Sequence, residues 1–244
     1  MTGPWFFAPR DAWHDDEIFL PADESHHALK VLRISPPDVI TVIDGQGVVA
    51  RCAASRIQGE FLVAHVLERE ERRRLRPEIV VYQGAPKGTK SDDVVERLAE
   101  LGIIELWFFG SERSVVRWDE RKIARSTERW RQIATGAAKQ SKNPYVMDVG
   151  GYVSWTELVR RAAKEAFTVV LWEEASLPLR TALTGPADRI ALVVGPEGGL
   201  ARGEAEALAD AGGQLVSLGP RILRTENAAF ATASALLYHY GLIG

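Results

Sequence analysis

The sequence contains a single cysteine, Cys52, among its 244 residues. One thiol cannot form a disulfide within the chain, and cysteine-based zinc sites need several thiolates. The adjacent His26 and His27 come without a second set of possible ligands. We therefore expect neither an intrachain disulfide nor a metal site.

Long apolar runs are also missing. No run approaches the roughly 20 residues that cross a bilayer, and the first ten residues lack the basic start and apolar core of a secretory signal. Hydrophobic residues make up 46% of the chain and charged residues 26%, as in ordinary globular proteins. These features predict a cytoplasmic protein with no membrane partner.

The chain has no excess of positive charge, because its net charge is −3 and its pI is about 6.0. This argues against a protein coated in nucleic acid but allows a local basic face. Arginines gather in two stretches, 69–76 and 113–131. The sequence leaves open whether these are solvated faces interleaved with glutamate or sites of phosphate contact.

The first 67 residues resemble short strands joined by turns. β-branched or apolar runs at 39–43, 48–52 and 61–66 predict strands, with a hairpin turn at 44–47 and one short helix at 25–32. This pattern predicts a small β-barrel. The charged stretch 68–76 predicts a junction, so we expect one domain over 1–72 and a second over 73–244.

From residue 78 onward, strand and helix patterns alternate. Strands are expected at 79–82, 103–109, 167–172, 190–194 and 215–218, and helices at 92–101 (capped by Ser91), 121–139, 155–166, 204–211 and 226–240. Alternation of this kind predicts an α/β domain with a parallel sheet. The continuous apolar runs at 167–172 and 190–194 indicate strands covered on both faces.

Three loops directly follow buried strands, beginning at Glu173, Gly195 and Gly219. Ligands of open α/β sheets bind at the carboxyl ends of the strands, and glycine lets the backbone approach a ligand. Taken alone, the glycine-rich loop 195–199 is more often a tight turn. It has neither the phosphate-loop lysine nor the spacing of the dinucleotide fingerprint.

In combination these loops are more specific. The segments G-P-E-G-G-L at 195–200, Glu204, and L-G-P-R-I-L-R-T-E at 218–226 resemble the RsmE family of SPOUT methyltransferases. The resemblance extends to 87–88, 100–102, 112–115 and 140–141, and the segments 27–33 and 44–47 resemble that family's PUA-like barrel. It therefore covers nearly the whole chain.

The resemblance implies a C-terminal SPOUT domain with a deep trefoil knot and an N-terminal PUA-like RNA-binding β-barrel. It also implies a homodimer that uses S-adenosylmethionine (S-adenosyl-L-methionine) to methylate N3 of one uridine in 16S rRNA of the small ribosomal subunit. The cofactor-binding residues that it implies are Leu171, Trp172, Glu173, Gly195, Glu197, Gly198, Gly199, Leu218, Gly219, Ile222, Leu223 and Arg224.

Candidate RNA contacts are Arg10, Arg33, Arg113, Lys142 and Asn143. Some of these lie where the sequence departs from the family: Arg10 follows an unusual aromatic start, and Lys142-Asn143 replaces an arginine-containing stretch. Two further departures are Lys139 for glutamate and Asn227 for threonine.

Arg224 and Glu226 are the catalytic candidates. Uracil N3 must lose its proton before it accepts a methyl group, and the charge then spreads to the flanking carbonyl oxygens, where Arg224 could stabilise it. Glu226 could orient Arg224 or help to remove the proton, although an acidic residue in the first turn of a helix is also simply stabilising. A non-catalytic RNA-binding or ribosome-assembly protein, or a SPOUT enzyme with another RNA target, are the alternatives.

Overall fold

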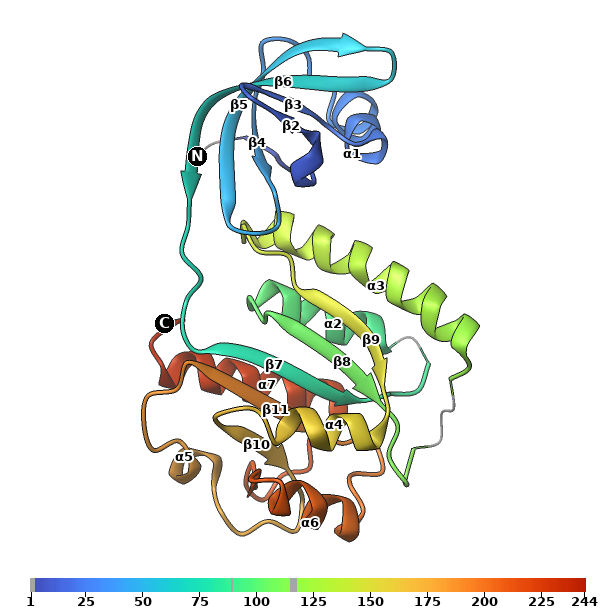
Figure 1. Cartoon of the computed structure of the whole chain (residues 1–244), viewed down its shortest axis with the longest axis vertical. Helices are drawn as coiled ribbons and strands as arrows, with labels where there is room; N and C mark the ends of the chain where they lie inside the picture. The colour runs from blue at the N-terminus through green and yellow to red at the C-terminus, as the bar shows by residue number, and fades with distance from the viewer. Residues whose placement is uncertain (1–2, 89, 115–117) are drawn as a thin grey trace. The chain divides into compact units, whose positions relative to one another are not determined.

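The chain falls into two compact units in the computed structural model, which describes residues 3–88, 90–114 and 118–244 (Figure 1). The first unit comprises Met1–Arg74 with Thr135–Val146, and the second Leu75–Ala134 with Met147–Gly244. The division after residue 74 lies close to the expected boundary. Residues 135–146, however, belong to the first unit, although the sequence pattern placed them in the second domain.

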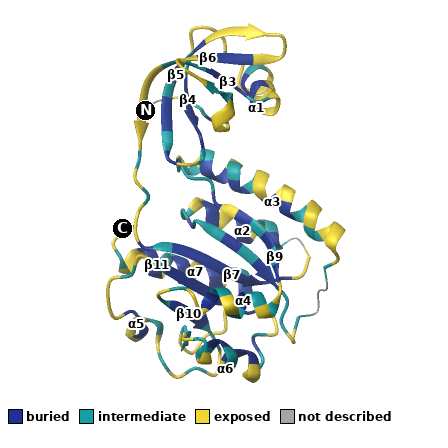
Figure 2. Cartoon of the chain, in the orientation of Figure 1, coloured by how far each residue is buried: buried dark blue, intermediate teal, exposed yellow. Residues whose placement is uncertain are grey.

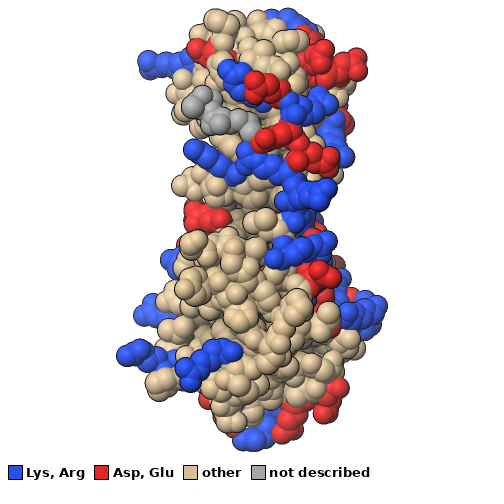
Figure 3. Space-filling model, turned by 90° about the vertical axis from the view of Figure 1, so that its left-hand side faces the viewer, with Lys and Arg blue, Asp and Glu red and all other residues tan. Residues whose placement is uncertain are grey.

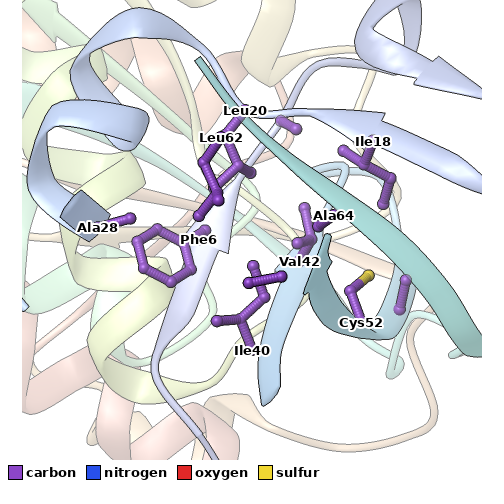
Figure 4. Close-up of a cluster of buried hydrophobic side chains, with 12 residues drawn as sticks. Phe6, Ile18, Leu20, Ala28, Ile40, Val42, Cys52, Leu62 and Ala64 are labelled. Carbon is purple, nitrogen blue, oxygen red and sulfur yellow. The ribbon is translucent and has the colours of Figure 1, made fainter. Parts of the chain in front are cut away.

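A six-stranded sheet forms the first unit, in the order β1 (Trp5–Phe7), β4 (Val39–Ile43), β5 (Val48–Gln58), β6 (Phe61–Glu71), β3 (Glu17–Phe19) and β2 (Trp13–His14). β1 runs parallel to β4, and the other pairs are antiparallel. A cluster of fully buried side chains, including Phe6, Ile40 and Leu62, forms its core (Figure 4). Its helical segments are η1 (Arg10–Ala12), α1 (Ala22–His26) and the π-helical turn η2 (His27–Val31). α1 and η2 correspond to the helix expected at 25–32, but the helical segment begins three residues earlier, at Ala22.

β5 and β6 are longer than the apolar pattern indicated. Glu68, Arg69, Glu70 and Glu71 pair with 48–51 in the antiparallel ladder. The ladder satisfies their backbone groups while the charged side chains remain exposed. The interpretation of 68–76 as a junction is therefore wrong for its first half, because the sheet ends only at Glu71.

The segment 135–146 completes the core of the first unit. It contains the end of α3 (Glu120–Ser141), where buried Ala138 packs with Ile43 and Val49. Lys139 forms an ion pair with Glu24, and the Val146 N–H donates to the Gly45 carbonyl at 3.0 Å. Helical periodicity fixes which face of α3 is apolar but not which unit that face covers.

The second unit contains a six-stranded sheet in the order β12 (Gln214–Val216), β10 (Thr168–Leu171), β11 (Arg189–Val194), β7 (Glu78–Gly84), β8 (Glu105–Phe109) and β9 (Asp148–Val153). All five neighbouring pairs are parallel, which confirms the expected α/β class. β9 was not expected, because Gly150 and Gly151 interrupt its apolar pattern.

Helices cover both faces of this sheet, and its central strands are buried (Figure 2). On one face, Leu158 of α4 (Trp155–Ala162) and Leu208 of α6 (Arg202–Asp210) pack against the strands. On the other lie α2 (Lys90–Glu100), which contacts α7 (Thr225–His239), and α3, whose Trp130 ring lies 4.4 Å from that of Phe108.

Two further helices need mention. The short α5 (Leu179–Ala182) lies between β10 and β11 in the chain. α2 includes Lys90, so Ser91 lies within the helix and does not cap it. No helix of the described residues is both long and apolar enough to cross a membrane.

Candidate functional site

A cavity of about 410 Å³ opens at the carboxyl ends of β10, β11 and β12. Parallel strands end at one edge of their sheet, so the three loops that follow them converge there. Every residue expected to bind the cofactor lines this cavity: Leu171, Trp172, Glu173, Gly195, Glu197, Gly198, Gly199, Leu218, Gly219, Ile222, Leu223 and Arg224. Pro196, Ser217, Arg221 and Thr225, which were not singled out, line it as well.

Local geometry explains two of the glycines beside the cavity. A Cβ on Gly84, at the end of β7, would lie 2.2 Å from the Pro196 backbone nitrogen and would force β7 and the loop 195–199 apart. Gly199 has φ +71°, a conformation that strains any other residue, while the Glu173 carboxylate 2.7 Å from a Cβ there ends a flexible side chain.

A buried pair of hydrogen bonds joins three chain segments beside the cavity. The Gln83 amide nitrogen at the end of β7 donates to the Thr225 hydroxyl at 2.7 Å. The Thr225 hydroxyl in turn donates to the Gly195 carbonyl at 2.6 Å. Gln83 is fully buried and Thr225 nearly so, and the rule that ligands gather at strand ends could have singled out Gln83.

Lys90 forms a charged cluster with two carboxylates of the site. Its ammonium lies 3.5 Å from Glu197 and 3.4 Å from Glu226. Burial raises the pKa of Glu197, but the Lys87 N–H, its own backbone N–H and the Lys90 charge outweigh burial and hold that pKa below its usual value. Glu197 is therefore a fixed negative charge, and Glu226 is paired with Lys90, not with Arg224.

Arg224 is the last residue before α7 and is exposed at the cavity. Among the described residues, its guanidinium has no hydrogen-bond or ion-pair partner. Its five N–H donors are thus free for a ligand. Nearby Arg221 also lines the cavity and is exposed.

Arg113, one of the candidate RNA contacts, contacts two residues that line the cavity. Its guanidinium is 3.3 Å from the Gly198 carbonyl and 3.5 Å from the Glu173 carboxylate. The largely buried Glu204 supports this arrangement, since it accepts from the N–H groups of Ala201 and Glu112 at 2.9 and 2.8 Å. Glu204 thereby ties the start of α6 to the loop that carries Arg113.

The other four candidate RNA contacts lie in the first unit. Arg10 is more than half exposed and contacts Asp44 at 2.9 Å. Arg33 and Lys142 are exposed and adopt positive φ, +57° and +58°. Asn143 accepts the Tyr145 N–H at 3.1 Å. In the view of Figure 3, basic side chains of the first unit lie among acidic ones.

Comparison with known proteins gives two family matches. Residues 73–237 match the family described as an RNA methyltransferase domain, and residues 20–67 match the RNA methyltransferase PUA domain. The first match covers most of the second unit, and the second lies within the first unit.

Individual relatives agree with these matches. The chain is 36% identical to the ribosomal RNA small subunit methyltransferase E of Mycobacterium tuberculosis over 88% of this chain and 83% of that protein. It is 34% identical to the protein of that name from Bacillus subtilis over 91% of this chain and 90% of that one. A crystal structure of the protein from Neisseria gonorrhoeae, bound to S-adenosyl methionine, is 28% identical, with a TM-score of 0.87 over 98% of both chains.

Proposed function

Since the chain belongs to the ribosomal RNA small subunit methyltransferase E family, we propose that it uses S-adenosylmethionine to methylate N3 of one uridine in 16S rRNA. The observation that carries the proposal is the cavity of about 410 Å³ formed by the three strand-end loops. The relative from Neisseria gonorrhoeae binds S-adenosyl methionine.

The residues around the cavity fit that cofactor. Apolar side chains such as Leu171, Ile222 and Leu223 suit an adenine ring, while the glycine-rich loops offer backbone N–H and carbonyl groups to the polar parts of the molecule. When bound, the cofactor supplies an electrophilic methyl group on a positively charged sulfur. The residues of the chain must hold the acceptor nitrogen in line with that methyl group.

Arg224 is the proposed catalytic residue of the chain. The uracil ring gains negative charge on its carbonyl oxygens as N3 gives its proton to solvent water, and an unpaired guanidinium at the cavity can donate to those oxygens. We assign Glu226 a supporting role. Its carboxylate pairs with Lys90 at 3.4 Å, which offsets part of the negative charge of Glu197 and Glu226.

We assign RNA binding to the first unit, the PUA-like domain expected over 1–72, and catalysis to the domain expected over 73–244. Of the candidate RNA contacts, Arg10 and Arg33 lie within 1–72, and Lys142 and Asn143 belong to the first unit although they fall in the expected domain 73–244. If Arg33 and Lys142 contact phosphates, RNA affinity falls steeply with salt, and R33A and K142A each flatten that dependence. Because the proposed substrate is 16S rRNA, we also propose a cytoplasmic location.

We further propose that the chain forms a homodimer through α7. Its outward face carries Phe230 and Tyr238, 37% and 72% exposed, and Ile243 just beyond the helix is 39% exposed. Glu226 is the only lysine, arginine, aspartate or glutamate of α7, and Figure 3 shows a broad area of the second unit without such side chains. Exposed apolar faces of this kind commonly mark interfaces.

We also propose that the second unit contains the trefoil knot of its family. The segment after β12 pairs with the segment after β10, since the Ser217 N–H donates to Leu177 at 2.8 Å and the Leu179 N–H donates to Ser217 at 3.2 Å. The chain then continues into α7, which packs against β7 and β11. A chain trace of 171–225 in an experimental density map tests this crossing.

Nucleoside mass spectrometry tests the proposed reaction. Small subunits from a strain that lacks the gene are incubated with purified protein and isotope-labelled S-adenosylmethionine, and their 16S rRNA is digested and mapped. We expect label in one N3-methyluridine with the wild-type chain and a strongly reduced amount with R224A. Label in a different RNA or at another atom would contradict the proposed substrate.

The second candidate function, a non-catalytic RNA-binding or assembly protein, gives a different result in the same assay. Such a protein binds the subunit but transfers no label. Calorimetric titration with S-adenosylmethionine separates the two at an earlier step, because absence of binding would favour the non-catalytic protein.

A further inference from the structure

Gln83 and Thr225 lie where three segments of the second unit meet beside the cavity. Gln83 ends β7, Thr225 begins α7, and the Gly195 carbonyl that Thr225 contacts begins the loop after β11. Gln83 is more than 100 residues away in the sequence from both Gly195 and Thr225. Two side-chain hydrogen bonds, of 2.7 and 2.6 Å, join all three.

The direction of these bonds follows from the chemistry of the groups. The Gly195 carbonyl can only accept a hydrogen bond, so the Thr225 hydroxyl must donate its hydrogen to that carbonyl. The hydroxyl oxygen must therefore accept from Gln83, and this places the NH2 of the amide toward Thr225. The same NH2 also donates to the Gly84 carbonyl at 3.0 Å, so the amide orientation is determined on both sides.

Burial makes this arrangement sensitive to change. Gln83 is 0% exposed and Thr225 is 5% exposed, and buried polar groups that lose a partner cannot recover it from water. The side-chain oxygen Oε1 of Gln83 has no partner among the described residues. The hydrogen bonds of the side-chain NH2 therefore have to offset the cost of burying the whole amide.

We propose that Gln83 and Thr225 are positioning residues that hold the loop 195–199 in the conformation that binds the cofactor. The proposal rests on the proposed function in one respect, namely that the cavity takes S-adenosylmethionine. Neither residue needs to touch the reacting atoms. They act through Gly195, which lines the cavity together with Glu197, Gly198 and Gly199.

The chain offers a matched control in the same helix. Thr232 of α7 is also fully buried, and its hydroxyl has no hydrogen-bond partner among the described residues. T225V and T232V both replace a hydroxyl by a methyl group at a buried position of α7, but only Thr225 lines the cavity and contacts the loop. T225S keeps the hydroxyl and tests for rescue.

The first measurement is the Kd of S-adenosylmethionine by calorimetry. We expect T225V and Q83M to weaken binding about tenfold, the effect of losing a buried hydrogen bond and leaving its partner unsatisfied. T225S and T232V should stay within about twofold of the wild type. Equal affinity of T225V and T232V would overturn the proposal.

The second measurement needs no cofactor, so it separates this proposal from the proposed function. Amide hydrogen exchange of the ligand-free protein follows the N–H of Gly199, which donates to the Pro196 carbonyl at 2.9 Å. We expect exchange in 195–199 to be faster in T225V and Q83M than in T232V. If the wild type binds no S-adenosylmethionine, the proposed function fails, and unchanged exchange in T225V would then separately refute the positioning role.

Discussion

A methyl group on Gly84 should displace the loop 195–199, which we propose binds the cofactor. The added Cβ would lie 2.2 Å from the Pro196 nitrogen and 2.6 Å from the Gly195 carbonyl carbon, whereas ordinary contact begins at 3.4 Å. The atoms that it meets include backbone, which cannot rotate away as a side chain can. Strand β7 and the loop must therefore separate by about 1.2 Å in G84A.

That displacement sets the size of the effect. Overpacking of a tightly packed site costs about 1–3 kcal/mol of stability, which corresponds to a fall in Tm of about 2–4 °C per kcal/mol for a chain of this length. The loop carries four of the expected cofactor-binding residues, so affinity for S-adenosylmethionine should fall by about tenfold or more. A loop shifted by 1 Å no longer presents its backbone groups at hydrogen-bond distance.

The control is G203A in α6. A Cβ at Gly203 meets no atom within 4 Å, and alanine is favoured over glycine in a helix by about 0.5–1 kcal/mol. Calorimetric titration and thermal unfolding of both variants give the comparison. If G84A bound S-adenosylmethionine as tightly as G203A and unfolded at the same temperature, the close approach of β7 to the loop would be refuted.

Three further results follow from particular contacts. Burial raises the pKa of the Cys52 thiol to about 12, so we expect no alkylation of the folded protein at pH 9 and rapid alkylation in urea, as followed by mass spectrometry. Because the pKa of Cys52 is higher in the folded than in the unfolded protein, its contribution to the free energy of unfolding is complete below about pH 9 and declines as the pH rises toward 12. R224A should lower the single-turnover methylation rate by about 100-fold while S-adenosylmethionine affinity changes far less. Sedimentation should show Y238R as a monomer, and a wild-type chain that is itself monomeric would refute the α7 interface.

The sequence predicted the second unit well where its pattern was strong. Buried parallel strands such as β10 and β11 are continuous apolar runs, and a residue that follows such a run must lie at the same edge of the sheet as its counterparts. This explains why every expected cofactor residue lines one cavity. β9 was missed because Gly150 and Gly151 occupy positions where a strand usually carries side chains, and the Trp107 ring fills the space beside Gly150.

Contacts between segments far apart in the chain could not be predicted from local sequence patterns. Lys90 belongs to a charged stretch that could equally be a solvated helix start, and only the fold brings it to Glu197 and Glu226. Arg113 likewise follows β8, and its charge and its place in the segment 112–115 predict an RNA contact, but only the fold shows that it contacts Gly198 and Glu173. Charge in a sequence identifies a type of partner but not which carboxylate or carbonyl will meet it.

Arg113 and Arg224 differ in whether their guanidinium groups already have partners. Arg113 already has a carboxylate and a carbonyl as partners, so a ligand gains little from it without breaking contacts at 3.5 and 3.3 Å. Arg224 is exposed at the same cavity without a recorded partner among the described residues, so its donors need no such exchange. A guanidinium that must stabilise charge only as the uracil ring loses its proton is most effective in that unpaired state, because no existing contact has to break when the charge develops. Arg113 therefore adds contacts to the loop 195–199, whereas Arg224 and Arg221, which both line the cavity and are exposed, keep their guanidinium groups available to a ligand.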